Sequence, residues 1–269
     1  MRPASVSAKS TDNDVPAADL QKFTSYAGRI HTLLDTAFTT SEIGVFYPVD
    51  SVRAAYNADT EHFNYNGDDE AAAVNRLMQH TCLEILKSGY DFTVLDDKSV
   101  SDSALEGGKM KIGAGLYSVI VMPHVKVMSY EALEKLTEFK NAGGTVIWLD
   151  CLPKECTDAR KAEAFKALAD GIKDKKYTGN IADALGKVCE IPFSAQVKSG
   201  VFVSEYKRTD DGKKILYLAN SSKTVKSIWV GSEQTGEYHI YDPYDCTVTP
   251  ASGKTQISIP AYRAILIVE

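Results

Sequence analysis

The pattern of hydrophobic and polar positions changes character near residue 197. Before that point, apolar positions spaced three and four apart, which predict helices, alternate with short continuous apolar runs, which predict buried strands. Apolar strands that alternate with amphipathic helices are typical of parallel βαβ units. The pattern therefore predicts an α/β fold with a flavodoxin-like parallel sheet. The expected helices are 19–38, 68–90, 129–144 and 157–172, and the expected strands are 42–49, 91–97, 117–124 and 145–150.

After residue 197, apolar and polar positions alternate singly, which predicts short strands with one buried face. Residues 201–222 contain two such runs joined by an Asp-Asp-Gly turn, and further runs follow up to the last residue. We therefore expect three parts: a flexible leader at 1–19, the α/β domain at 20–196 and a small all-β sandwich at 197–269.

Composition and charge exclude some classes of partner. The formal net charge is -6 at pH 7, so we expect no nucleic-acid partner, because nucleic-acid binders usually carry a basic face. No apolar run reaches the roughly 18 residues that span a bilayer, and the start of the chain has no apolar signal core, so the compartment stays open. The five dispersed cysteines form no Cys-x-x-Cys pair, so we expect no metal and no cofactor.

Cys151 directly follows an expected strand, where open α/β sheets place ligands and nucleophiles. A nucleophile elbow is a strained turn flanked by small residues, whereas Cys151 lies between Asp150 and Leu152. The neighbouring carboxylate would raise the pKa of the thiol and disfavour the thiolate. Among the histidines, only His124 follows a strand of this domain. We predict structural roles for Cys151 and His124, and keep a thiol-dependent hydrolase that uses both as an alternative.

Ligand-binding candidates lie at the carboxyl edge of the predicted sheet, where α/β proteins bind ligands. A polar and aromatic loop at 59–70 follows the first strand, and strand-end aspartates either line this edge or cap helices. The glycine-rich stretch 105–118 lacks a phosphate-loop pattern, and we expect a turn there. The candidates at this edge are Asp50, Tyr56, Asn57, His62 and Asn64, together with His124.

Aromatic residues of the second domain raise the alternative of a carbohydrate-binding module, because exposed aromatic rings can stack on sugar rings. Strand alternation sends about half of these rings into the core, so core packing is the expected role for most of them. Tyr241 and Tyr244 flank a Pro-containing turn and are the ones expected to be exposed.

The segments also carry a family resemblance. A Tyr-x-x-Arg helix (Tyr26, Arg29) followed by a strand that ends in Tyr-Pro (Tyr47, Pro48) resembles the segment that leaves the catalytic barrel in the α-L-rhamnosidases of glycoside hydrolase family 106. Most of the later chain resembles that family's amidotransferase-like domain and terminal β-sandwich. The first domain is also similar to the amidotransferase-like domain of family 42 β-galactosidases, where it helps to build the trimer and lacks glutaminase chemistry.

The resemblance implies that the chain is the non-catalytic accessory or oligomerisation portion of a bacterial-type glycoside hydrolase, or a stand-alone paralogue of it. The family's barrel, with its paired catalytic carboxylates, would precede residue 20, so no catalytic residue is carried onto this sequence. The implied partners are that barrel, a carbohydrate and further copies of the chain. The resemblance leaves the compartment unknown, with an exported parent as one alternative.

Overall fold

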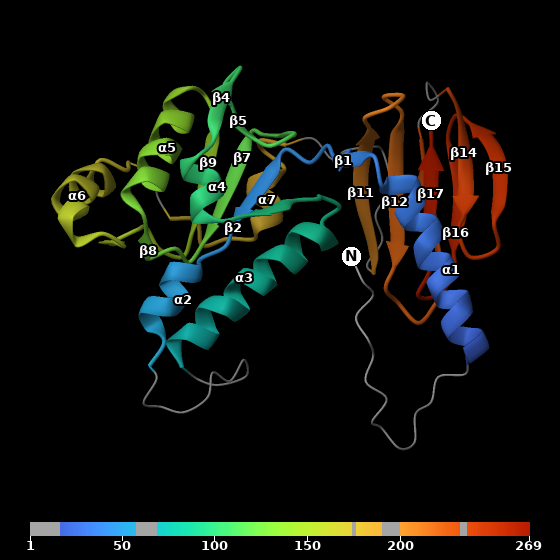
Figure 1. Ribbon diagram of the computed structural model, residues 1–269, viewed down its shortest axis with the longest axis horizontal. Helices are drawn as coiled ribbons and strands as arrows, with labels where there is room; N and C mark the ends of the chain where they lie inside the picture. Colours follow the sequence, from blue (N-terminus) through green and yellow to red (C-terminus); the bar gives the residue numbers. More distant parts are fainter. Residues whose placement is uncertain (1–16, 58–68, 174–175, 190–199, 232–235) are drawn as a thin grey trace.

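The computed structural model contains an α/β unit and a β-rich unit that lie next to each other (Figure 1). It describes residues 17–57, 69–173, 176–189, 200–231 and 236–269. The mixed parallel and antiparallel content confirms an α/β fold followed by a β-rich region.

The α/β unit is built on a parallel sheet of four strands, at the four places where apolar runs predicted them. The strand order is β3-β2-β7-β9, so the second strand in the chain lies outside the first. Every residue of β2 and β7 is buried, as expected for a parallel sheet that is covered on both faces. The strands are β2 (Ile43–Phe46), β3 (Thr93–Leu95), β7 (Val119–Pro123) and β9 (Thr145–Leu149).

The two faces of this sheet bury separate apolar cores. Alternate residues of β7 divide between them: Ile120 and Met122 join one core, and Val119 and Val121 join the other. Helix α5 supplies Phe139 to the first core. The helices of this unit are α2 (Val49–Ala55), α3 (Glu70–Lys87), α4 (Asp97–Ser101), α5 (Tyr130–Asn141), α6 (Ala162–Asp170) and α7 (Ile181–Leu185), with one 3-10 turn, η2 (Ala159–Lys161).

Side-chain caps start four of the described α-helices of this unit, α3, α4, α5 and α7. The sequence suggested Ser129 and the strand-end aspartates as caps. Ser129 accepts a hydrogen bond from the backbone N–H of Ala132, which confirms it as the N-cap of α5. Asp96 caps α4 in the same way through Ser99 N–H, so this strand-end aspartate is a cap. Gly143 follows the C-cap residue of α5 and has a φ of 104°, which only glycine readily adopts, so the helix stops before it.

The glycine-rich stretch at 105–118 differs from the expected turn. It forms a three-stranded antiparallel sheet from β4 (Ala104–Glu106), β5 (Lys109–Ile112) and β6 (Gly115–Tyr117). Met110 explains the difference, because its fully buried side chain anchors β5 to the core of the α/β unit. A further short parallel pair joins β8 (Val127–Met128) to β10 (Glu155–Cys156).

The β-rich unit contains a six-stranded antiparallel sheet and a two-stranded one, with a core between them formed by alternate strand residues. Its first turn is the expected Asp-Asp-Gly, in which Gly212 has a φ of 70°. The large sheet has the order β1 (Ala37–Thr39), β11 (Val201–Arg208), β12 (Lys214–Asn220), β17 (Ala264–Val268), β14 (Glu237–Asp242) and β15 (Thr247–Ser252), and the small one pairs β13 (Lys226–Val230) with β16 (Thr255–Ile259).

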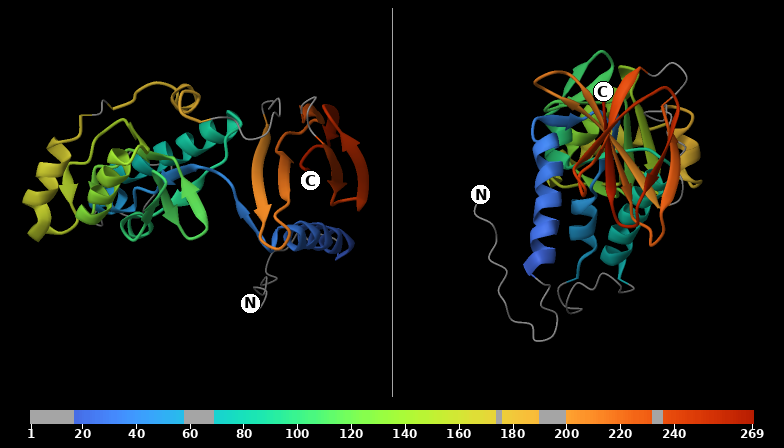
Figure 2. Two further views of the ribbon diagram at one scale, coloured as in Figure 1. Left: turned by 90° about the horizontal axis from the view of Figure 1, so that it is seen from above. Right: turned by 90° about the vertical axis from the view of Figure 1, so that its right-hand side faces the viewer.

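Helix α1 (Ala17–Leu34) and strand β1 lie on the β-rich unit, whereas the sequence pattern grouped their residues with the α/β domain at 20–196. Strand β1 extends the large sheet by antiparallel pairing with β11. Helix α1 crosses the outer face of that sheet and stands apart from the α/β unit in the left view of Figure 2. The chain therefore passes over the β-rich unit before it builds the α/β unit.

Helix α1 is held to the sheet by a clamp of polar contacts. The guanidinium of Arg29 donates to the carbonyl oxygens of Pro243 and Tyr244 at 2.8 and 3.3 Å. The hydroxyl of Tyr26 accepts a hydrogen bond from the backbone N–H of Ala264 at 2.8 Å. These contacts tie the start of the described chain to its C-terminal strands.

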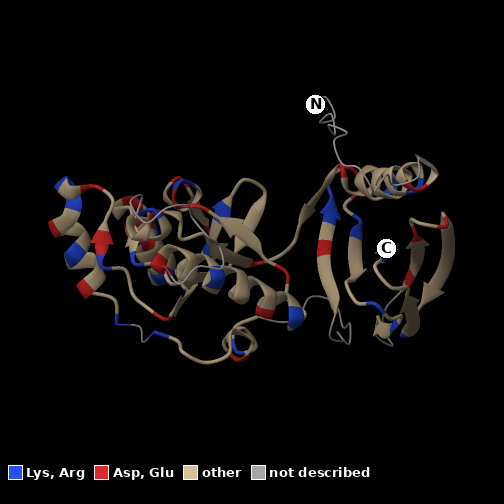
Figure 3. Ribbon diagram, turned by 90° about the horizontal axis from the view of Figure 1, so that it is seen from below, with Lys and Arg blue, Asp and Glu red and all other residues tan. Residues whose placement is uncertain are grey.

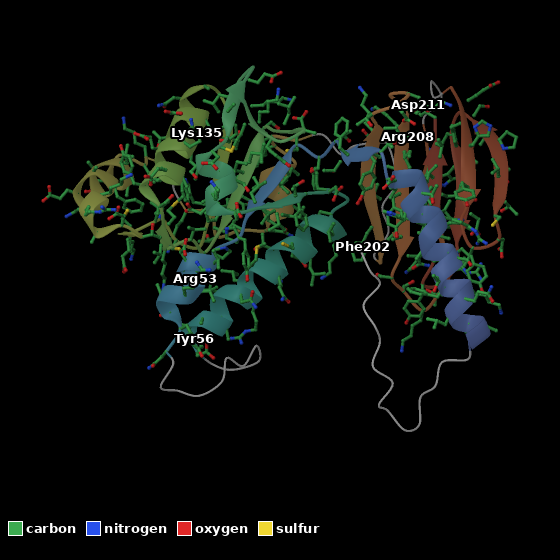
Figure 4. The ribbon with its side chains drawn as sticks, viewed as in Figure 1. Arg53, Tyr56, Lys135, Phe202, Arg208 and Asp211 are labelled. Atoms are coloured by element: carbon green, nitrogen blue, oxygen red, sulfur yellow. The ribbon has the colours of Figure 1, made fainter. Side chains whose placement is uncertain are left out.

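The junction between the two units is polar. Thr40 donates through its backbone N–H to the carbonyl oxygen of Glu205 and through its hydroxyl to the carboxylate of Glu205. The hydroxyl of Ser41 donates to the carbonyl oxygen of Asp91 at 2.7 Å, and burial raises the pKa of the Asp91 side chain. Phe202 of β11 lies beside the end of α3 at this junction (Figure 4).

Acidic and basic residues are interspersed over both units (Figure 3). Within the described ranges, no helix combines the length and the apolar character that crossing a bilayer requires.

Gly44 in β2 provides a test of the packing of the parallel sheet. A Cβ atom at this position would lie 2.4 Å from Cδ1 of Leu95 and 2.8 Å from Cδ1 of Ile120. We expect Gly44→Ala to lower the free energy of unfolding by about 1–3 kcal/mol through overpacking. Gly28→Ala in α1 is the control: nothing lies within 4 Å of the added methyl group, so it should gain up to about 1 kcal/mol of helix stability. Urea unfolding followed by circular dichroism measures both, and equal effects would contradict this packing.

Arg29 provides a test of the clamp on α1. Arg29→Met removes the donors to two carbonyl oxygens, so we expect α1 to detach more often and to be cleaved faster in limited proteolysis. Arg53→Met is the matched control, because Arg53 is exposed on α2 and its ion pair with Asp50 lies within that helix. Unchanged cleavage of α1 in Arg29→Met would show that other contacts hold the helix.

Candidate functional site

The carboxyl ends of β7 and β9 place two polar residues side by side. His124 follows β7 and Asp150 follows β9, and the strand register puts their preceding residues, Pro123 and Leu149, opposite each other. Both have positive φ angles, 51° for His124 and 69° for Asp150. Non-glycine residues rarely adopt this region, although His and Asp tolerate it better than most. The chain is thus strained at two adjacent points of one sheet edge.

The two strained residues form a direct contact. Nδ1 of His124 lies 2.5 Å from Oδ2 of Asp150. An ionised carboxylate only accepts hydrogen bonds, so Nδ1–H donates and the imidazole is held in one orientation. The His124 side chain is 17% exposed and that of Asp150 is 54% exposed. The pair therefore presents an oriented carboxylate to solvent.

The strained position after β9 is occupied by Asp150, one residue before the thiol that the sequence singled out. Asp150 is the central residue of a three-residue turn, which the backbone N–H of Cys151 closes by donating to the carbonyl oxygen of Leu149 at 2.8 Å. A γ-turn with positive φ at its centre is rare and strained. A nucleophile elbow holds its reactive residue in a strained turn, and here the turn holds a carboxylate.

Cys151 itself is half-buried and held as a thiol. Burial, and next the charge of Asp150, raise its pKa to about 11, against the opposing effect of Lys126 and other lysines. The thiolate is the nucleophilic form of cysteine, so this environment disfavours thiol chemistry at neutral pH. His124 pairs with Asp150 and orients the carboxylate.

An ion pair borders the same edge. Lys126, in the loop after β7, pairs with Glu70 in the first turn of α3, and this contact lowers the pKa of Glu70. Both side chains are partly exposed, so the pair contributes little to stability. It ties the start of α3 to the loop that carries His124.

The other candidates at this edge lie on or after α2. Asp50 pairs with Arg53 at 3.2 Å within the helix, and Tyr56 is its exposed C-cap residue, as Figure 4 shows for Arg53 and Tyr56. Asn57 follows directly. The structure does not bring these residues into the His124–Asp150 contact. Two further candidates, His62 and Asn64, lie outside the described residues.

A pocket of about 410 Å³ opens beside Asp150. Helix α3 forms one side of it, and the segment after residue 176, which pairs with β9 through Tyr177, forms the other. Sites for small molecules have volumes of about 300–1,000 Å³. The lining residues are Leu77, His80, Thr81, Glu84, Leu149, Asp150, Tyr177, Thr178, Gly179, Asn180 and Ile181.

Tyr241 and Tyr244 lie at the α1 clamp in the β-rich unit. The guanidinium of Arg263 stacks on the ring of Tyr244, 3.5 Å from its centroid, and the ring of Tyr26 meets Tyr244 edge-on. Tyr241 is half-buried and lines a hollow beneath α1 together with Arg29. Tyr244 is 40% exposed, as expected, although Arg263 covers one face of its ring, whereas Tyr241 is less exposed than expected.

Within the described part of the chain, no three His, Cys, Asp or Glu residues gather as a metal site would require. All five cysteines lie in that part, and all are free.

Sequence reasoning missed several residues of this edge. Glu70, Lys126, His80 and Tyr177 carry no motif, and they meet only because α3 and the segment after residue 176 pack against the ends of β7 and β9. Asp150 was considered as the neighbour of Cys151 and beside the strand-end aspartates, but it was not chosen as a site residue. The signal that could have marked it is its place directly after a buried strand, because Asp tolerates the sharp turn needed there.

No protein-family model and no curated protein matches the sequence. Solved structures do match. Gan42B, a GH42 β-galactosidase from G. stearothermophilus, is similar over 85% of this chain and 40% of its own, with a TM-score of 0.52 and 9% identity. The β-galactosidase from Bacillus circulans sp. alkalophilus is similar over 91% and 43%, with a TM-score of 0.52 and 13% identity.

A third solved structure widens the set beyond β-galactosidases. α-L-Fucosidase isoenzyme 2 from Paenibacillus thiaminolyticus is similar over 90% of this chain and 50% of its own, with a TM-score of 0.50 and 10% identity. The chain therefore spans half or less of the length of these three enzymes. At such identities the likeness concerns the fold alone, and the chain has a glycoside hydrolase-related fold.

Proposed function

We propose that this chain is the non-catalytic accessory portion of a carbohydrate-active glycoside hydrolase and packs against a catalytic barrel or against further copies of itself. The fold it shares with two β-galactosidases and a fucosidase supports a carbohydrate-active parent. Its coverage of half or less of those chains is consistent with an accessory part.

The observation that carries the non-catalytic role is the turn after β9. The strained position holds Asp150, and the adjacent Cys151 is a half-buried thiol with a pKa of about 11. A thiol-dependent hydrolase needs a thiolate and a nearby base. The contact of His124 Nδ1 with Asp150 leaves Nε2 able to act as a base, so the raised pKa of Cys151 is the observation that weakens this reading. The alternative that uses Cys151 and His124 is therefore the weaker one.

In finer detail, we propose that the α/β unit is flavodoxin-like and descends from an amidotransferase-like domain. In chain order, its parallel strands are arranged 2-1-3-4, which agrees with the first four positions of the flavodoxin order. Pairing of Tyr177 beside Leu149 occupies the place of a fifth strand.

The rhamnosidase-like segment fits a structural role in this proposal. Tyr26 and Arg29 form the α1 clamp, and Tyr47 donates its backbone N–H to the carbonyl oxygen of Leu95 at the end of β2. Through these contacts, the residues of the resemblance motif would fix the positions of α1 and β2 at the point where the chain would leave a barrel. The carbohydrate-binding alternative is weaker, because the guanidinium of Arg263 and the ring of Tyr26 already contact the ring of Tyr244.

The state of Cys151 can be measured by alkylation. At pH 8, a thiol with a pKa of about 11 carries about a hundredfold less thiolate than one at the ordinary value of 9, so we expect iodoacetamide to label Cys151 slowly. The labelling rate should rise steeply as the pH approaches 11, since the thiol then ionises. Cys246 is exposed and serves as the internal comparison in peptide mass spectra. Labelling of Cys151 that is fast and independent of pH between 6 and 8 would favour the thiol hydrolase.

The accessory role is tested by activity and by size. We expect the chain alone to hydrolyse neither glutamine nor aryl β-D-galactosides, α-L-fucosides and α-L-rhamnosides above the buffer rate. In source cells, an antibody to this chain should detect a polypeptide far heavier than 29.4 kDa or a stable complex with one. Turnover that disappears in Cys151→Ser would overturn the proposal.

A further inference from the structure

We propose that the pocket beside Asp150 binds a neutral, hydroxyl-rich ring of monosaccharide size, with Asp150 and Glu84 accepting hydrogen bonds from its hydroxyl groups. The accessory role needs no ligand, so this site goes beyond it. Only the choice of sugars as probes rests on the proposed function.

The first support is the strain at Asp150. The turn is closed by Cys151 N–H, and the backbone N–H of Asp150 donates to the carbonyl oxygen of Tyr177 at 3.3 Å on the pocket side. Backbone strain that the surroundings maintain is concentrated at functional sites. Here the strained turn holds a carboxylate, 54% exposed, at the wall of a pocket and at the carboxyl edge of a parallel sheet.

The second support is the supply of hydrogen-bonding groups. Asp150 and Glu84 reach the pocket from different elements, the end of β9 and α3, so they can engage different hydroxyl groups of one ring. His80 adds an imidazole from α3. The side-chain oxygen of Asn180 accepts from Ala182 N–H, so its NH₂ group is the part that can donate to a ligand.

The third support is charge. Glu84 already pairs with Lys87 at 3.0 Å, and Asp150 accepts from His124 at 2.5 Å. A carboxylate has about four acceptor sites, so each retains capacity for a hydroxyl group. Because two acidic residues line the pocket, an anion is disfavoured. The carboxylate of each already has a hydrogen-bonding partner, Lys87 or His124, which lowers the gain from binding a cation.

The fourth support is the apolar part of the lining. Leu77, Leu149 and Ile181 form apolar surface, and Tyr177 adds an aromatic side chain whose hydroxyl donates to the carbonyl oxygen of Asn180. A sugar ring has hydroxyl groups at its rim and C–H groups on its faces. This lining offers both kinds of surface, as small-molecule sites do.

Binding of single sugars to the whole chain tests the proposal. We expect D-galactose, L-fucose or L-rhamnose to give saturation-transfer signals and a dissociation constant on the order of 1 mM by calorimetry. Asp150→Asn and Glu84→Gln should each weaken binding at least tenfold, because each removes a charged acceptor. The resonances of His80 and Tyr177 should shift when the sugar binds.

Asp102→Asn is the matched control. Asp102 is also an exposed carboxylate of the α/β unit with one basic partner, Lys98, but it does not line the pocket. It should leave sugar binding unchanged. Equal binding by Asp150→Asn and the unmodified chain would overturn the proposal, and so would the absence of sugar binding up to about 50 mM. Binding of methylamine in place of the sugars would also overturn it, because it would identify a cationic ligand.

Asp150→Gly separates loss of the ligand contact from loss of the fold. Glycine adopts a φ of 69° without strain, so this variant should unfold at the same or a higher urea concentration than the unmodified chain. It should nevertheless lose sugar binding at least tenfold. A stable Asp150→Gly variant that still binds would refute the site. Neither result decides the accessory role. That role is tested separately, by assays of turnover and by the size of the native polypeptide.

Discussion

The pairing of β7 with β9 is the contact on which the proposed site depends. Strand β7 is apolar throughout and β9 is apolar after Thr145, and both lie between two cores, so their register cannot slip without exposing buried side chains. That register places the residues after the two strands side by side. The His124–Asp150 contact, the strained turns and the wall of the pocket all follow from it. A rigid sheet is thus the support for a polar edge made from loop residues.

That edge combines features which point away from thiol chemistry. A strained turn directly after a strand is a feature of enzymes that use a nucleophile elbow, and such a turn follows β9 here with a carboxylate at its centre. The thiol next to it is half-buried beside that negative charge, which keeps it protonated. A carboxylate oriented by an imidazole is suited to accepting hydrogen bonds. The presence of an oriented carboxylate in the turn, beside a thiol that stays protonated, is the physical basis for proposing ligand binding at this edge without catalysis.

The β-rich unit shows how a motif can serve packing. Tyr26, Arg29 and Tyr244 are residue types common in sugar-binding sites, and here they contact one another and the backbone of the last strands. Their contacts hold α1 on the outer face of the large sheet. With β1 they make the first described residues part of the β-rich unit, so the two units are interleaved along the chain and are joined by polar contacts at Thr40 and Ser41.

The sequence by itself determined the local elements. Continuous apolar runs predicted the four parallel strands, single alternation predicted the antiparallel strands, and Ser129 and Gly143 marked the ends of α5, because burial and capping depend on residues close in sequence. It also gave reason to doubt Cys151 from its neighbour Asp150. Only the tertiary structure decided that α1 and β1 pack on the β-rich unit, that Met110 draws a glycine-rich stretch into a small sheet, and that Asp150 meets His124 and shares a pocket with Glu84. These outcomes depend on contacts between residues far apart in the chain, and no local pattern encodes which distant surfaces will meet.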